Sequence, residues 1–77
     1  MDIDDLENLI WLIENQGEIV IGSIGPAPCA AVASDKYSQL AALIKKPNET
    51  VGELLLRLDL AIQKADEEEI YIDEINS

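Results

Sequence analysis

The chain has a single cysteine, Cys29, and no histidine among its 77 residues. An intrachain disulfide therefore cannot form, and a zinc site built from cysteine and histidine is excluded. A domain of this size buries only about 60% of the surface that its unfolded chain exposes, so small domains commonly rely on a cross-link, a metal or self-association. This chain must be stabilised by a well-packed core, by an oligomer, or by a metal bound without histidine.

Composition places the chain among globular proteins, since 48% of its residues are hydrophobic. We expect residues 1–77 to form a single small domain. The opening MDIDDLENLI carries acids where a signal peptide carries bases, and apolar stretches such as residues 9–13 and 29–33 fall short of the roughly 20 residues that cross a bilayer. We therefore expect a soluble cytoplasmic protein in a reducing compartment, without membrane association.

The formal charge of −11 is unevenly distributed along the chain. Residues 1–35 contain seven acids and no lysine or arginine, residues 36–64 contain all five bases, and residues 65–77 contain six further acids. Direct binding to nucleic acid requires clustered lysine and arginine, so it is not expected here. The charge favours a basic protein partner, and solubility alone is the alternative explanation.

Apolar residues at helical spacing predict a first helix over residues 3–16. Asp2 or Asp4 can cap its start, and Gly17 ends it. The stripe that we expect this helix to bury consists of Ile3, Leu6, Leu9, Ile10 and Ile13. Trp11 lies off this stripe, on the flank that also holds Glu7 and Asn15.

Two further helices are predicted. Ser34 or Asp35 can cap a helix over residues 35–46, in which apolar residues recur at helical spacing before Pro47. The segment TVGE then places Thr50 and Glu53 at capping-box spacing, directly before a leucine-rich run that ends near residue 67.

Strands are predicted between and after these helices. The β-branched run EIVIGS predicts a strand over residues 18–23, the small residues CAAVAS a second over residues 29–34, and residues 70–75 a possible third. The element order is then α-β-β-α-α-β. We expect an α+β fold with helices packed on one face of a two- or three-stranded antiparallel sheet.

The strings CAAVASD, GELLLRLDLAI and IDEIN resemble those of small uncharacterised bacterial open reading frames. The resemblance covers roughly residues 18–77 and implies no activity. It implies a bacterial or prophage-borne accessory protein.

Motifs for catalysis and cofactor binding fail on inspection. Without histidine, no Cys–His or Ser–His nucleophile pair can form, and Cys29 reads as a small buried hydrophobe. The glycines of GSIGPAP lack the lysine of a phosphate-binding loop, so this segment reads as a turn. The carboxylates of the C-terminal segment are not spaced around a glycine turn as in a calcium loop. We expect no cofactor and no metal.

The function expected from these features is a small, non-enzymatic protein-interaction module that binds a basic partner. Inhibitor, adaptor, antitoxin-like and nucleic-acid-mimic roles all remain open, and the alternative is a metal-dependent or acid–base enzyme built on carboxylates.

Leu56 and Leu60 point away from the apolar stripe of their helix, so we expect them to form a homodimer interface unless helix 1 and the sheet bury them within one chain. Trp11 raises the same question on the first helix. The expected partner-binding residues are Trp11, Leu56, Leu60, Glu67, Glu68, Glu69, Asp73 and Glu74.

Overall fold

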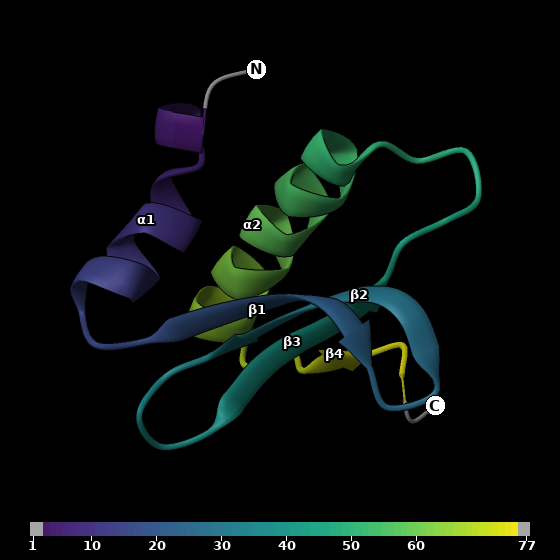
Figure 1. The fold of residues 1–77 in the computed structure, drawn as a ribbon. Coiled ribbons are helices and arrows are strands. Elements are labelled where there is room, and N and C mark those ends of the chain that lie inside the picture. The colour runs from purple at the N-terminus through teal and green to yellow at the C-terminus, as the bar shows by residue number, and fades with distance from the viewer. Residues whose placement is uncertain (1–2, 76–77) are drawn as a thin grey trace.

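The computed structural model describes residues 3–75, which form one small α+β domain (Figure 1). A short 3₁₀ helix, η1, precedes the first α-helix. In chain order the elements are η1 (Ile3–Asp5), α1 (Glu7–Glu14), β1 (Glu18–Ile24), β2 (Ala27–Ser34), β3 (Gln39–Ile44), α2 (Val51–Glu68) and β4 (Ile72–Asp73).

The four strands form one mixed sheet in the order β1-β2-β3-β4. The pairs β1–β2 and β2–β3 are antiparallel, whereas β4 runs parallel to β3 after the chain has crossed over through α2. Figure 1 shows both helices on one side of this sheet. No helix within residues 3–75 combines the length and the apolar character that spanning a membrane requires.

The predicted α+β class is confirmed, but the predicted element order and sheet were wrong in detail. The order is α-β-β-β-α-β instead of α-β-β-α-α-β, and the sheet has four strands with one parallel pair instead of two or three antiparallel strands. Both differences have the same origin, because the segment predicted as a second helix is strand β3.

β3 replaces the helix predicted over residues 35–46. Its six residues, QLAALI, fit a helical period at Leu40, Ala41 and Ile44, but the last five of them are also all apolar. A short apolar run of this kind fits a central strand as well as it fits a helix. β3 is flanked by β2 and β4, and three of its successive residues, Ala41, Ala42 and Leu43, are buried.

Asp35 stabilises a tight hairpin turn between β2 and β3, and not the start of a helix. Its Oδ1 accepts hydrogen bonds from the backbone N–H groups of Tyr37 and Ser38, each at 2.7 Å, and its own N–H donates to the Ser38 carbonyl at 2.9 Å. An aspartate that binds backbone N–H groups two and three residues ahead serves a helix cap and a turn alike. The capping prediction identified the right chemistry in the wrong element.

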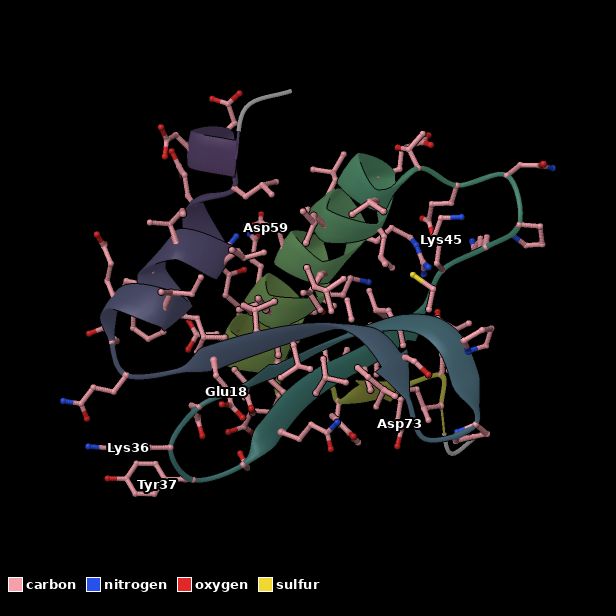
Figure 2. The ribbon with its side chains drawn as sticks, viewed as in Figure 1. Glu18, Lys36, Tyr37, Lys45, Asp59 and Asp73 are labelled. Carbon is pink, nitrogen blue, oxygen red and sulfur yellow. The ribbon has the colours of Figure 1, made fainter. Side chains whose placement is uncertain are left out.

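The helix α1 begins at Glu7, later than predicted, and its N-cap residue, Leu6, provides no side-chain hydrogen bond. The buried carboxylate of Asp59, on α2, accepts from the Leu9 N–H at 2.9 Å and from Asn8 Nδ2 at 3.2 Å. Asp59 is only 7% exposed and lies between the two helices in Figure 2. It supplies from α2 the acceptor that α1 lacks locally.

The helix α2 starts with the predicted capping box. Glu53 N–H donates to Thr50 Oγ1 at 3.1 Å, and Thr50 N–H donates to Glu53 Oε1 at 2.8 Å. Beyond this cap, α2 packs its apolar stripe against α1 and against alanines of the sheet, whose small side chains allow close approach. The buried core consists of Leu6, Leu9, Leu12, Ala31, Ala33, Ala41, Leu43, Leu54, Leu58, Ala61 and Ile62. Ile13, expected in the first stripe, is exposed, and Leu12 takes its place.

The predicted strand over residues 70–75 forms only across Ile72–Asp73. Ile72 pairs with Ala41 and Asp73 with Ala42, and the Glu74 N–H donates to the Ala42 carbonyl at 2.8 Å. This short parallel pairing makes β4 the edge strand beside β3.

Arg57 fastens that C-terminal segment to the rest of the domain. Its guanidinium makes a bidentate pair with Glu49, at 2.6 and 3.0 Å, and also binds Glu74 Oε2 at 3.0 Å and the Ile44 carbonyl at 2.9 Å. Glu74 Oε1 in turn accepts from the Ile44 N–H at 2.8 Å. We call Arg57, Glu49 and Glu74 the Arg57 network; it joins α2, the loop before it and the chain after β4.

Candidate interaction groove

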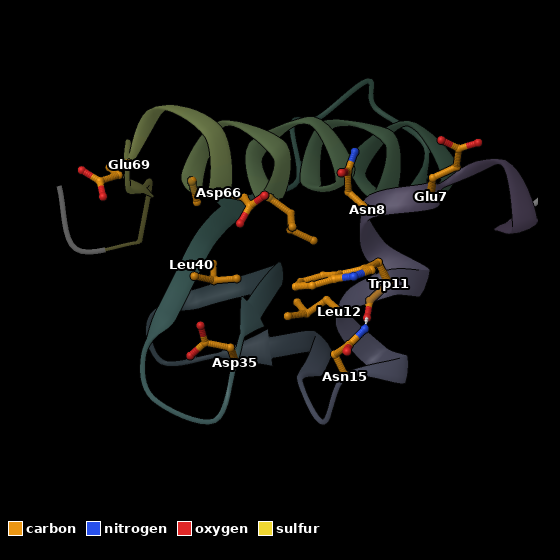
Figure 3. Close-up of a pocket in the computed structure, with 11 residues that line it drawn as sticks. Glu7, Asn8, Trp11, Leu12, Asn15, Asp35, Leu40, Asp66 and Glu69 are labelled. Carbon is orange, nitrogen blue, oxygen red and sulfur yellow. Dashed lines mark hydrogen bonds between the residues drawn. The ribbon is translucent and has the colours of Figure 1, made fainter.

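A groove of about 520 Å³ lies between α1, the second half of α2 and the start of β3 (Figure 3). This volume falls within the roughly 300–1,000 Å³ typical of ligand sites. We call it the Trp11 groove. Its lining residues are Glu7, Asn8, Trp11, Leu12, Asn15, Asp35, Leu40, Ile62, Ala65, Asp66 and Glu69.

Trp11 occupies the middle of this groove in Figure 3. Its side chain is 56% exposed, although tryptophan is the largest apolar side chain in the sequence. The α1 backbone around it is held by Asn15, whose Nδ2 donates to the Trp11 carbonyl at 2.7 Å. The indole is therefore presented from an ordered helix and remains accessible to a ligand.

The apolar floor of the groove comes from three different elements: Leu12 of α1, Ile62 of α2 and Leu40 of β3. Leu40 reaches it because the pairing of β2 with β3 shifts between Ala33 and Ser34. A bulge of this kind turns a side chain toward the other face of a sheet, so that Leu40 and its neighbour Ala41 both pack against the core.

Four carboxylates line the groove, those of Glu7, Asp35, Asp66 and Glu69, and no lysine or arginine lines it. In Figure 3, Asp66 and Asp35 lie across the groove from the indole, whereas Glu7 and Glu69 lie at its two ends with their carboxylates directed away from the indole. Asp35 accepts hydrogen bonds from the backbone N–H groups of Ser38 and Tyr37. These bonds lower the pKa of its carboxyl below the ordinary value, and the bond from Ser38 has the larger effect. Asp35 therefore carries its negative charge at neutral pH.

Nearby basic residues do not neutralise this rim. Lys36 follows Asp35 directly, but its ammonium lies 5.2 Å from the centroid of the Tyr37 ring, and both side chains extend away from the domain in Figure 2. Both salt bridges found within residues 3–75 belong to Arg57. The groove thus combines an exposed aromatic ring with uncompensated negative charge.

The predicted partner-binding residues are divided among several sites. Only Trp11 and Glu69 line the Trp11 groove. Leu56 and Leu60 are 44% and 51% exposed on another side of α2, where Leu60 and Ile72 line a shallow pocket of about 180 Å³.

The other predicted acids also have separate roles. Glu74 belongs to the Arg57 network, and Asp73 accepts from the Ile75 N–H at 3.0 Å and from the Tyr71 hydroxyl at 3.3 Å. Burial and the charge of Asp73 raise the pKa of Tyr71. Glu67 and Glu68 are exposed at the end of α2.

Three groove acids, Glu7, Asp35 and Asp66, were missed as site residues. Glu7 carried a usable signal, because it was expected on the same helical flank as Trp11. Asp66 lies in the last turn of α2 and Glu69 is the residue that caps its C-terminal end, so both belong to the same helix end. Asp35 carried no such signal, since only the folded β2–β3 hairpin brings it to α1.

Metal and nucleophile chemistry find little support in the geometry. Within residues 3–75, no three side chains of the Asp, Glu or Cys type lie close enough together to hold a metal ion. Cys29 is half-buried on β2, more accessible than the buried hydrophobe that was expected. The comparisons with known proteins add no assignment, because no family model, curated protein or solved structure matches this chain.

Proposed function

We propose that the chain is a small, non-enzymatic interaction module that binds a basic protein partner. The observation that carries this proposal is the Trp11 groove, whose lining includes an exposed indole and four carboxylates but no basic side chain. Interfaces favour aromatic anchors, and charge complementarity selects a partner of opposite sign.

The net charge of −11 supports the same proposal at longer range. A negative field of this size accelerates encounter with a basic protein and weakens as salt is added. Inhibitor, adaptor, antitoxin-like and nucleic-acid-mimic roles all share this requirement. The proposed setting is the cytoplasm, where the one unpaired cysteine stays reduced.

A carboxylate-based enzyme is the less favoured proposal. General acid catalysis by a carboxyl requires a pKa raised by burial or by a neighbouring acid. Asp35, which lines the Trp11 groove, has its pKa lowered by two backbone N–H groups instead. The hydrogen bonds of the β2–β3 turn thus shift the pKa of this acid in the direction opposite to the one that proton transfer requires.

We further propose that Leu56 and Leu60 mediate self-association. Both are about half exposed, and burying a leucine contributes roughly 1.5–3 kcal/mol, which is large for a domain of this size. The double substitution Leu56→Ser with Leu60→Ser should give a folded monomer in sedimentation experiments. A dimer that persists unchanged in this variant would remove these residues from the interface.

The partner proposal is tested by affinity capture from a lysate of the native host, at low and at high ionic strength. Basic proteins should be retained at low salt and released at high salt, and partners should be identified by mass spectrometry. The matched control is the variant Asp66→Asn with Glu69→Gln, which should retain less of the same proteins. Captured proteins with no excess of basic character, equally retained by the control, would contradict the proposal.

A further inference from the structure

We infer that the Trp11 groove receives an arginine side chain from the basic partner, with the guanidinium laid against the indole and hydrogen-bonded to carboxylates of the groove lining. This inference rests on the proposed function and narrows it to one site and one side-chain chemistry. Three properties of the groove support it.

The exposed indole is the first property. Trp11 is 56% exposed and sits in the middle of the groove, so one part of its surface is open to a ligand (Figure 3). Tryptophan is the best aromatic partner for a cation, and a guanidinium also stacks on it as a plane.

The distribution of charge is the second property. The four carboxylates come from α1, from the β2–β3 turn and from the end of α2, so the groove is acidic on several sides. A guanidinium has five N–H donors spread around a plane and can bind more than one carboxylate at once. The compact ammonium of lysine matches such a spread of acceptors less well.

The apolar floor is the third property. Leu12, Leu40 and Ile62 lie beside the indole, and the three methylenes of an arginine can pack on them while its head reaches the acids. Guanidinium is also more weakly hydrated than ammonium, so it enters an apolar groove at lower cost.

A second copy of this chain cannot supply that arginine. Arg57 is its only arginine, and the Arg57 network occupies the guanidinium with Glu49, Glu74 and the Ile44 carbonyl. The arginine must therefore come from a different protein.

Trp11 is the only tryptophan in the chain, so its fluorescence reports directly on the groove. The experiment titrates the full-length protein with a short peptide of alternating arginine and glycine, and with the same peptide carrying uncharged citrulline in place of arginine. The arginine peptide should change the emission saturably, and the citrulline peptide should bind at least about tenfold more weakly.

Two variants with equal changes in net charge separate the groove from general attraction. Asp66→Asn with Glu69→Gln removes two groove carboxylates, whereas Glu14→Gln with Glu18→Gln removes two exposed carboxylates elsewhere. The groove variant should weaken binding by roughly tenfold more than the control variant. In calorimetry, Trp11→Leu should weaken it by roughly two- to thirtyfold, the range of a cation–π contact.

Each outcome bears on a defined part of the inference. Equal weakening by the two charge variants would overturn the groove assignment and leave the proposal of a basic partner standing. Equal binding of the citrulline and arginine peptides would overturn the arginine chemistry itself. Absence of any arginine-peptide binding would also overturn the inference, while salt-sensitive capture of basic proteins from lysate would still uphold the proposed function.

Discussion

Carboxylates around Arg57 and carboxylates around Trp11 sit in opposite electrostatic environments. Glu49 and Glu74 each bind the same guanidinium, whereas Glu7, Asp66 and Glu69 have no lysine or arginine within salt-bridge distance in the part of the chain that the structure describes. The first pair is occupied in holding the fold together. Under the proposed function, the second set contacts the partner.

The difference shows that acid density in a sequence does not define a binding surface. The C-terminal segment contributes Asp66 and Glu69 to the groove, Glu74 to the Arg57 network, and Asp73 to local backbone and tyrosine contacts. Neighbouring acids thus serve different purposes, according to whether the fold places a donor beside them.

The largest expected effect on stability follows from breaking the structural side of this comparison. Arg57→Ala removes both ion pairs and the bond to the Ile44 carbonyl, so the free energy of unfolding should fall by about 2 kcal/mol. Urea denaturation measures it. Lys64→Ala, which removes a cation from an exposed position of the same helix, should change stability by less than about 0.5 kcal/mol. Equal losses would mean that the Arg57 network has no special structural role.

Lowering the pH should weaken the Arg57 network without any mutation. The loss of unfolding free energy should be smaller than in Arg57→Ala, because Arg57 keeps its hydrogen bond to the Ile44 carbonyl. Hydrogen bonds from Arg57 and from the Lys46 N–H lower the pKa of Glu49 from 4.5 to about 2. A depressed carboxyl pKa stabilises the fold above the unfolded value, and this contribution disappears as the pH falls toward the folded value.

A matched variant isolates that contribution from the other acids. The difference in unfolding free energy between the native chain and Glu49→Gln should be constant above about pH 5 and should vanish as the pH falls from 4.5 toward 2. Chemical denaturation across this pH range measures the difference. A difference that stays unchanged down to pH 2 would show that the charge of Glu49 does not stabilise the fold.

Asp59 is a third kind of acid in this comparison, because it is buried between the two helices and caps α1. Asp59→Ala should lower the free energy of unfolding by about 1.5 kcal/mol, since the Leu9 N–H loses its acceptor. Asp59→Asn keeps an oxygen there and should restore part of the loss. If asparagine proves as destabilising as alanine, the hydrogen bond to Leu9 is not the source of the effect.

Thr50 gives a smaller expected effect and tests the start of α2, the helix that carries both Arg57 and Asp66. Thr50→Ala removes the oxygen that accepts from the Glu53 N–H and should cost about 1 kcal/mol, whereas Thr50→Ser keeps that oxygen. The denaturation midpoints of the native chain, Thr50→Ala and Thr50→Ser measure this loss of stability. A midpoint for Thr50→Ala equal to that of the native chain would place the start of the helix elsewhere.

The capping box at Thr50 and Glu53 was predictable because all its partners lie within four residues. The strand β3 was not, because its apolar run fits two periodicities, and only its position between β2 and β4 decides between them. The same limit applies to the groove: Glu7 and Trp11 share a predictable flank, but Asp35 joins them only through the fold.

The central claim is that the two acids of the Arg57 network support stability, whereas the acids of the Trp11 groove support binding. Its most direct test compares Glu49→Gln with Glu74→Gln against Asp66→Asn with Glu69→Gln, each pair changing the net charge equally. Denaturation midpoint and arginine-peptide affinity, read from Trp11 fluorescence, are measured for both. The first pair should lower the midpoint and retain the affinity, and the second should retain the midpoint and lose the affinity. Two pairs with the same profile in both measurements would contradict the account.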